Sequence, residues 1–96
     1  MTSLNFILET LKQHKAYLHE KYGVSEIGVF GSYTRSDFTE NSDVDILVDF
    51  DRKIGIEFIT LADELEKILK NKVDLSKKSL IKSHYWPYIQ KDLVYV

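Results

Sequence analysis

The sequence predicts an α/β (α+β) fold in which a small mixed β-sheet is flanked by helices. Apolar residues recur at spacings of three, four and seven along residues 4–22 and again along 55–70, as amphipathic helices require. Residues 43–50 instead alternate with the period of two that is typical of a half-buried strand. Because helices and strands alternate within 96 residues, we expect residues 1–96 to form a single domain.

The first helix is expected between Ser3, a suitable N-cap, and Gly23, a suitable C-terminal stop. The segment Glu26–Phe30 is short, apolar and partly β-branched, which predicts a strand that ends at the Gly31-Ser32 pair. The polar residues 33–42 then predict a short helical turn followed by a loop.

The clearest strand signal lies in Asp43–Phe50. One set of alternating positions is apolar, and the other set carries the carboxylates: Val44, Ile46, Val48 and Phe50 alternate with Asp43, Asp45, Leu47 and Asp49. This pattern predicts a strand with one face on the core and the other turned away from it.

The second half of the chain predicts a long helix over Gly55–Lys70, with Asn71 placed to end it. Val73–Leu75 is expected to form a brief strand, and Pro87 suits the first turn of a short final helix. Residues 94–96 are compatible with extended backbone. The aromatic residues of the final segment, Tyr85, Trp86 and Tyr88, are expected to pack in the core rather than form a partner-binding patch.

Composition narrows the classes of function. The chain has no cysteine, which excludes disulfides and thiolate chemistry and fits a reducing, cytoplasmic setting. No apolar run approaches the ~20 residues that span a bilayer, so neither a membrane anchor nor export is expected. The formal charge of −2 gives no general attraction to nucleic acid. A chain this short without a disulfide is also expected to gain stability from a ligand or partner.

The carboxylates of Asp43–Phe50 suggest metal-assisted phosphate chemistry. Residues i and i+2 of a strand project from the same face, so Asp43 and Asp45 should lie side by side. Two neighbouring anions repel, and a divalent cation such as Mg²⁺, which prefers oxygen ligands, would neutralise them. Asp74 on the next predicted strand is a third candidate ligand if that strand pairs beside the first.

The Gly31-Ser32 turn adds features suited to a triphosphate. Glycine permits close approach of the backbone, and a hydroxyl beside free N–H groups can hold phosphate oxygens. Arg35 lies one helical turn later and could add a positive charge to the same phosphates. Two simpler readings compete with these roles, since Ser32 is also a suitable helix N-cap and Arg35 could form a surface ion pair.

This pattern resembles the minimal nucleotidyltransferase (MNT) family of the DNA polymerase beta-like nucleotidyltransferase superfamily. The family signature is a Gly-Ser turn, a spacer and an Asp-x-Asp strand, and the resemblance runs from about residue 27 to 75. Minimal members usually carry Ala-Arg-Gly after Gly-Ser-x, whereas this chain has Thr34-Arg35-Ser36 and so retains the arginine. The resemblance implies the polymerase beta-like nucleotidyltransferase fold.

The resemblance also implies a mechanism and a biological role. Asp43, Asp45 and Asp74 would be the catalytic metal ligands, with Asp74 at the metal nearer the acceptor, and Gly31, Ser32 and Arg35 would bind the nucleotide. A hydroxyl would attack the α-phosphorus of ATP in a two-metal arrangement with Mg²⁺, and pyrophosphate would leave. Some minimal members are antitoxins that transfer AMP to a tyrosine of an all-helical HEPN-family toxin, and this chain resembles them in size and layout.

Two alternatives remain open at this point. The chain could be a non-catalytic antitoxin that neutralises its partner by binding, or a nucleotidyltransferase that modifies a small molecule with the help of a partner subunit. Polymerisation of nucleic acid is disfavoured because 96 residues leave no room for a template-binding domain or basic groove. The sequence does not separate ATP from other triphosphates, nor a homo-oligomer from a hetero-oligomer.

Overall fold

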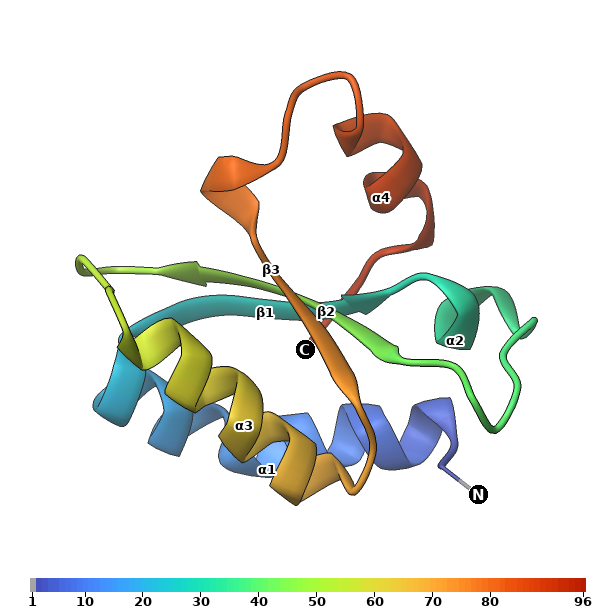
Figure 1. Cartoon of the computed structure of the whole chain (residues 1–96), viewed down its shortest axis with the longest axis horizontal. Helices are drawn as coiled ribbons and strands as arrows, with labels where there is room; N and C mark the ends of the chain where they lie inside the picture. The colour runs from blue at the N-terminus through green and yellow to red at the C-terminus, as the bar shows by residue number, and fades with distance from the viewer. Residues whose placement is uncertain (1) are drawn as a thin grey trace.

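Helices and strands alternate along residues 2–96, which the computed structural model describes (Figure 1). In chain order the elements are α1 (Leu4–Tyr22), β1 (Val24–Phe30), α2 (Ser32–Arg35), β2 (Val44–Phe50), α3 (Glu57–Leu69), β3 (Val73–Lys77), the 3-10 turn η1 (Lys78–Leu80), α4 (Trp86–Asp92) and β4 (Val94–Tyr95). The predicted small mixed sheet flanked by helices is confirmed. The strands β1 and β3 are each two residues longer than the sequence pattern indicated.

The four strands form one sheet in the order β3-β2-β1-β4. β1 pairs antiparallel with both β2 and β4, whereas β2 and β3 are parallel and are joined through the crossover helix α3. The parallel pairing aligns Val44 with Val73 and Asp45 with Asp74. The beginnings of β2 and β3 therefore lie side by side at one end of the sheet.

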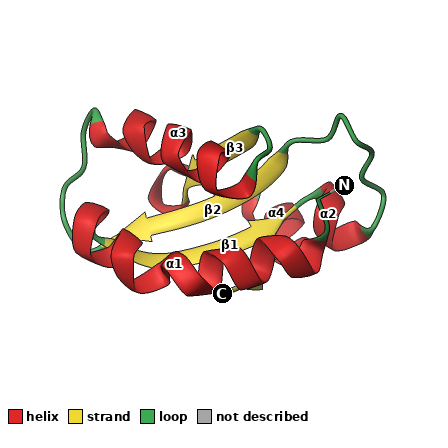
Figure 2. Ribbon diagram, turned by 90° about the horizontal axis from the view of Figure 1, so that it is seen from below, coloured by secondary structure: helices red, strands yellow, loops and turns green. Residues whose placement is uncertain are grey.

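One face of the sheet is covered by α1 and α3, which run across it in Figures 1 and 2. Of the apolar positions of β2, Val44, Ile46 and Val48 are fully buried in this layer, as the alternating pattern predicted, and Phe50 is partly buried. The core consists of aliphatic and tyrosine side chains from α1, β1, α2, β2 and α3: Ile7, Leu11, Leu18, Tyr22, Val24, Ile27, Val29, Tyr33, Val44, Ile46, Val48, Leu61, Leu65 and Leu69. Burial of this apolar surface is the main stabilising contribution to the fold.

The sequence predicts both ends of α1 correctly but misplaces the C-terminal end of α3. Ser3 caps α1 by accepting a hydrogen bond from the backbone N–H of Phe6 at 3.2 Å, and Gly23 ends it in the left-handed conformation at φ 77°. α3 differs from the prediction, because Lys70 rather than Asn71 takes the left-handed C-cap position at φ 56°. The amide of Asn71 instead donates to the hydroxyl of Tyr33 at 2.9 Å.

The opposite face of the sheet carries η1, α4 and the loop between them, which rise away from the strands in Figure 1. Leu47 of β2 is buried on this side although the alternation placed it among the polar positions. The expectation that Tyr85 and Tyr88 pack in the core was wrong, since both are exposed, and Trp86 is only partly buried. Among residues 2–96, no helix is long and apolar enough to cross a membrane.

Candidate active site

The turn between β1 and α2 brings backbone directly against a carboxylate. Gly31 has φ 80° and ψ −149°, a conformation that side chains rarely adopt. A Cβ atom on this residue would overlap with Oδ2 of Asp45. Glycine is therefore required here for two reasons, its backbone conformation and its lack of a side chain. The structure thus joins two elements of the predicted site that are fourteen residues apart in the sequence.

Ser32 does not act as the N-cap of α2. The cap position belongs to Gly31, whose carbonyl accepts from the backbone N–H groups of Thr34 and Arg35 at 3.1 Å each, and no side chain caps the helix. Ser32 is the first helical residue, and none of the hydrogen bonds found among residues 2–96 uses its hydroxyl. Because Ser32 is half-buried beside the turn and its hydroxyl is not engaged in capping, the hydroxyl is available to a ligand.

The three predicted carboxylates gather at one end of the sheet. Asp45 lies in β2 and is aligned with Asp74 of β3, while Asp43 directly precedes β2 rather than forming part of it as predicted. Asp45 is half-buried, whereas Asp43 and Asp74 are exposed. The side chain of Asp45 alternates with core-facing Val44 and Ile46, so it lies on the face away from α1 and α3.

Asp45 is the most electrostatically perturbed acid of the site. Burial, followed by the negative charges of Asp74 and Asp43, raises its pKa to about 6, and the positive charge of Arg35 opposes that rise. A carboxylate held among other carboxylates in a partly desolvated position is costly when ionised. The local field therefore favours the arrival of positive charge.

This chemistry fits a divalent cation. Within residues 2–96, no three acidic or histidine side chains already converge as a closed set of metal ligands. Mg²⁺ does not need such a set, because it usually takes one or two protein carboxylates and completes its octahedral shell with water and phosphate oxygens. Asp45, with Asp43 or Asp74, supplies that number of hard oxygen ligands at a position where negative charge is in excess.

Arg35, at the end of α2, is held by two carboxylates. Its Nε donates to Asp37 Oδ2 at 3.0 Å and its Nη1 donates to Asp92 Oδ2 at 2.9 Å, which raises the pKa of the guanidinium further above its usual range. The ion-pair reading of Arg35 is therefore correct for this structure. The positive charge of Arg35 nevertheless acts on Asp45, where it opposes part of the rise in pKa. Nη2 of Arg35 takes part in none of the hydrogen bonds found among residues 2–96.

Two contributors to the site were not anticipated from the sequence. Asp92 lies in α4, 57 residues beyond Arg35, and its side chain is only 14% exposed. Tyr33 fixes the underside of the turn, because its ring stacks on Phe38 at 4.3 Å and its hydroxyl accepts from Asn71 next to β3. Neither contact has a signal in local spacing, since both join segments that meet only in the folded chain.

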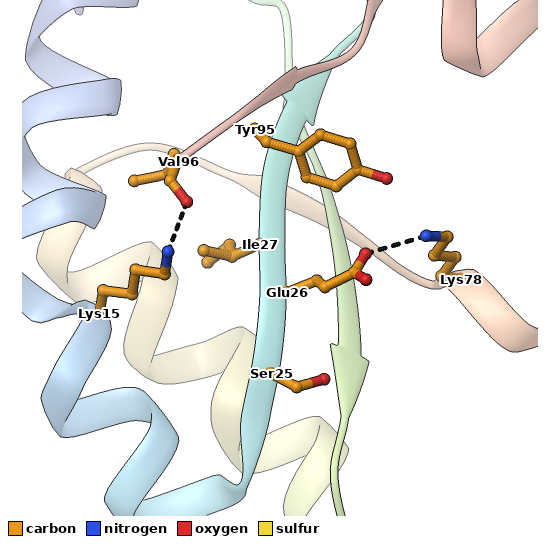
Figure 3. A pocket seen from close by; sticks show the side chains of 7 residues that line it. All are labelled: Lys15, Ser25, Glu26, Ile27, Lys78, Tyr95 and Val96. Atoms are coloured by element: carbon orange, nitrogen blue, oxygen red, sulfur yellow. Dashed lines mark hydrogen bonds and ion pairs between the residues drawn. The ribbon is translucent and has the colours of Figure 1, made fainter.

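A surface pocket lies at another edge of the sheet, beside the start of β1 and the end of the chain (Figure 3). Lys15 Nζ donates to the backbone oxygen of Val96 at 2.8 Å, and Lys78 Nζ donates to Glu26 Oε2 at 2.9 Å. The pocket is lined by Lys15, Ser25, Glu26, Ile27, Lys78, Tyr95 and Val96. None of these residues belongs to the predicted site. The carboxylate cluster is chemically the better candidate, because it is where charge and backbone geometry are both unusual.

Comparison with known proteins identifies the family to which the chain belongs. The family model described as "Nucleotidyltransferase domain" matches residues 11–95, which is most of the chain and includes every predicted site residue. The chain belongs to the nucleotidyltransferase family. It is a nucleotidyltransferase enzyme, and the resemblance to minimal nucleotidyltransferases is confirmed.

This nucleotidyltransferase has well-matched relatives of the same size. The protein adenylyltransferase MntA of Thermococcus cleftensis is 46% identical over 97 residues, covering 100% of this chain and 98% of the relative. Such a match over both full lengths means that the relative has essentially no additional domain.

Solved structures support the fold. A toxin-antitoxin crystal structure with AMP-PNP matches with a TM-score of 0.70 at 24% identity, covering 95% of this chain and 69% of the other. The complex of a tri-AMPylated HEPN toxin with an MNT antitoxin from Shewanella oneidensis matches with a TM-score of 0.66 at 22% identity, covering 94% and 70%. At these identities the likeness concerns the fold, which is that of minimal nucleotidyltransferases.

Proposed function

We propose that this chain is a Mg²⁺-dependent protein adenylyltransferase that transfers AMP from ATP to a tyrosine hydroxyl of a HEPN-family toxin and thereby acts as its antitoxin. The observation that carries the proposal is the position of Asp45. It lies against the Gly31 turn on one side and is aligned with Asp74 on the other, with Asp43 two residues before it. The backbone that would bind phosphate and the carboxylates that would bind the metal are therefore adjacent.

The relatives support the choice of nucleotide and acceptor. The Thermococcus cleftensis relative is a protein adenylyltransferase, which indicates AMP as the group transferred and a protein as its acceptor. One structural neighbour was crystallised with AMP-PNP, and another is an MNT antitoxin bound to an AMPylated HEPN toxin. A tyrosine is the expected acceptor because members of the resembled family modify that residue.

Three residues of the β1–α2 turn and of α2 would bind the triphosphate during the reaction. Gly31 allows the triphosphate to approach the turn, and Ser32 offers its hydroxyl to a phosphate oxygen. Arg35 would turn Nη2 toward the phosphates and balance part of their charge. The tyrosine hydroxyl loses its proton to water and its oxygen bonds to the α-phosphorus. The bond from that phosphorus to the bridging oxygen breaks, and pyrophosphate leaves.

The carboxylates would hold the metal and orient the acceptor. Asp43 and Asp45 would bind Mg²⁺ together with the triphosphate, and Asp74 would bind on the acceptor side of the same cluster. When bound, Mg²⁺ supplies Lewis-acid stabilisation of the charge that develops on the phosphate oxygens and lowers the pKa of the attacking hydroxyl. Because burial and the neighbouring carboxylates already disfavour the ionised form of Asp45, the positive charge of a bound Mg²⁺ would stabilise it.

The deciding experiment is intact mass spectrometry of the protein encoded beside this gene after incubation with this chain, ATP and Mg²⁺. We expect a mass gain of one or more AMP units, mapped to tyrosine. The matched control is the Asp43→Ala/Asp45→Ala double variant, which should give no gain while still folding, because neither residue belongs to the core. A partner that gains no mass with the wild-type chain would contradict the proposal.

The same experiment addresses the two alternatives. If wild type and double variant form equally stable complexes and protect cells equally from the partner, the chain is an antitoxin that acts by occlusion. Transfer of AMP to a small molecule would instead leave the partner's mass unchanged while pyrophosphate is still released. The match to the Thermococcus cleftensis relative over both full lengths favours a protein acceptor, because that relative has the same size and is a protein adenylyltransferase.

A further inference from the structure

Residues 78–92, which comprise η1, α4 and the loop that joins them, form a lobe on the sheet face opposite α1 and α3 (Figure 1). Large apolar side chains on this lobe are left in solvent: Leu80 is 77% exposed, Tyr85 is 56% exposed and Tyr88 is 74% exposed. Single exposed apolar residues are ordinary, but a group that includes two tyrosines within a short lobe is typical of a protein-binding surface.

The lobe also differs in charge from the rest of the chain. Residues 78–92 contain three lysines and one acidic residue, Asp92, which pairs with Arg35, although the whole chain has 13 basic and 15 acidic residues. The rest of the chain therefore holds ten basic residues against 14 acidic ones. Lys82 and Lys91 are exposed and form none of the ion pairs found among residues 2–96. The lobe is therefore a basic and aromatic surface on an otherwise acidic molecule.

Contacts at both ends fix the lobe on the sheet, and the contact at its end is made with a residue of the candidate active site. At its start, Lys78 pairs with Glu26 at 2.9 Å, as Figure 3 shows, and lies over the ring of Trp86 at 5.5 Å. At its end, Asp92 pairs with Arg35 at 2.9 Å. Because Asp45 also lies on the sheet face away from α1 and α3, the lobe and the carboxylates are on the same side of the molecule.

We propose that the outer face of this lobe, formed by Leu80, Lys82, Tyr85, Tyr88 and Lys91, is the docking surface for the protein acceptor. The face that it contacts on the acceptor would be apolar at its centre and acidic at its edge. Tyr85, Tyr88 and Lys91 follow one another at three-residue spacing, so they share one side of α4, while Trp86 and Ile89 are partly buried on the other. This proposal rests on the proposed function, because it specifies how the acceptor reaches the site.

A protein fits this surface better than a nucleic acid does. Among residues 2–96, only two of the lobe's three lysines, Lys82 and Lys91, form no ion pair or ring contact, which is few for neutralising a phosphate backbone. Asp43 and Asp74 are exposed nearby and would repel phosphates that no metal neutralises. Exposed tyrosines surrounded by lysines instead match the composition of protein interfaces, where aromatic residues supply most of the binding free energy.

The test separates docking from catalysis by measuring two equilibria. Calorimetry gives the Kd of the partner encoded beside this gene without nucleotide, and the Kd of AMP-PNP·Mg²⁺ for the chain alone. We expect Tyr85→Ser/Tyr88→Ser, and separately Lys82→Glu/Lys91→Glu, to weaken partner binding by about tenfold or more. Neither variant should change the Kd of AMP-PNP·Mg²⁺. The wild-type Kd for the partner should rise with salt, and the lysine variant should lose most of that dependence.

The matched control is Ile56→Ser/Ile59→Ser at the start of α3, where the side chains are 79% and 63% exposed. This control should bind the partner as wild type does. The proposal is overturned if the lobe variants bind the partner normally, if the α3 control weakens binding equally, or if a single-stranded RNA probe binds the lobe and the partner does not. If the partner binds through the lobe but gains no AMP, the docking surface stands and the catalytic proposal fails.

Discussion

The two faces of the β-sheet consist of alternate residues of the same strands, yet one face forms the apolar core and the other carries the carboxylates of the candidate site. On the face beneath α1 and α3, Val44, Ile46 and Val48 are fully buried in an aliphatic core. On the other face of β2, Asp45 and Asp49 replace aliphatic residues, whereas Leu47 is buried. The first face minimises exposed apolar surface, whereas the second concentrates like charges.

This difference shows how a chain of 96 residues can hold both a core and a reactive site. Because strand side chains alternate, a carboxylate can be placed beside a core residue without disturbing it. The cost of the charged face appears as the raised pKa of Asp45, and the covered face must offset that cost by burial. Substitutions on the two faces should therefore separate activity from stability.

The largest expected effect is on activity, from Asp74→Asn. Loss of this carboxylate should lower AMP transfer by about a thousandfold or more, because a metal ligand contributes several kcal/mol to the transition state. The thermal unfolding midpoint should change little, since Asp74 is exposed. Transfer is measured as the rate of partner AMPylation at saturating ATP. Retained activity with Asp74→Asn would restrict the catalytic carboxylates to Asp43 and Asp45.

The opposite result is expected for Leu65→Ala on the covered face. Leu65 is fully buried in α3, so truncation should lower the free energy of unfolding by about 3 kcal/mol. Urea denaturation measures this loss, and kcat should be unchanged under conditions where the variant stays folded. Ile59→Ala, on the same helix but 63% exposed, is the control and should cost less than about 0.5 kcal/mol. Equal losses for the two variants would contradict the assignment of the core.

A smaller effect on the charged face is expected from Arg35→Ala. If Nη2 contacts the triphosphate, the KM for ATP should rise about tenfold, the loss expected for one charge-assisted hydrogen bond. Arg35→Lys should recover only part of it, because lysine cannot keep the contacts to Asp37 and Asp92 in the same planar geometry. A KM that stays at the wild-type value in Arg35→Ala would leave Arg35 with only its ion pairs.

The covered face could be predicted from the sequence because its signals are local. The spacing of apolar residues in α1 and α3, the Ser3 and Gly23 caps, and the alternation in β2 each depend on neighbours within a few residues. The end of α3 was misplaced because Asn71 is a good terminator by type, whereas the fold uses Lys70 and directs Asn71 to Tyr33. Tertiary contacts overrode a correct local preference.

The charged face was predictable only in part. The residue types and spacing of Gly31, Asp43 and Asp45 indicated phosphate and metal chemistry, and Asp74 on the next predicted strand was a third candidate that the resemblance to a family supported. The alignment of Asp45 with Asp74, and the contact between Gly31 and Asp45, depend on strand pairing that no local pattern specifies. The Arg35–Asp92 pair and the exposure of Tyr85 and Tyr88 likewise arise only when the chain end folds back over the sheet.

The smallest expected effect is a gain in stability from Asp45→Asn, a variant that should also lose AMP transfer as Asp74→Asn does. The pKa of Asp45 is raised from 3.8 to about 6, so its ionised form at pH 7 destabilises the fold, and the destabilisation disappears as pH falls from about 6 to below 4. A full two-unit shift would correspond to about 3 kcal/mol, but solvent screening of this half-exposed group reduces the expected gain to about 1 kcal/mol.

Urea denaturation of wild type and Asp45→Asn in EDTA, at pH 7 and at pH 4, measures this gain in the free energy of unfolding. The gain should be present at pH 7 and nearly absent at pH 4, while Asp63→Asn, an exposed carboxylate of α3 outside the ion pairs found among residues 2–96, should show neither. Adding Mg²⁺ at pH 7 should stabilise the wild type more than Asp45→Asn, and an equal response of the two proteins would mean that the cation does not bind at Asp45.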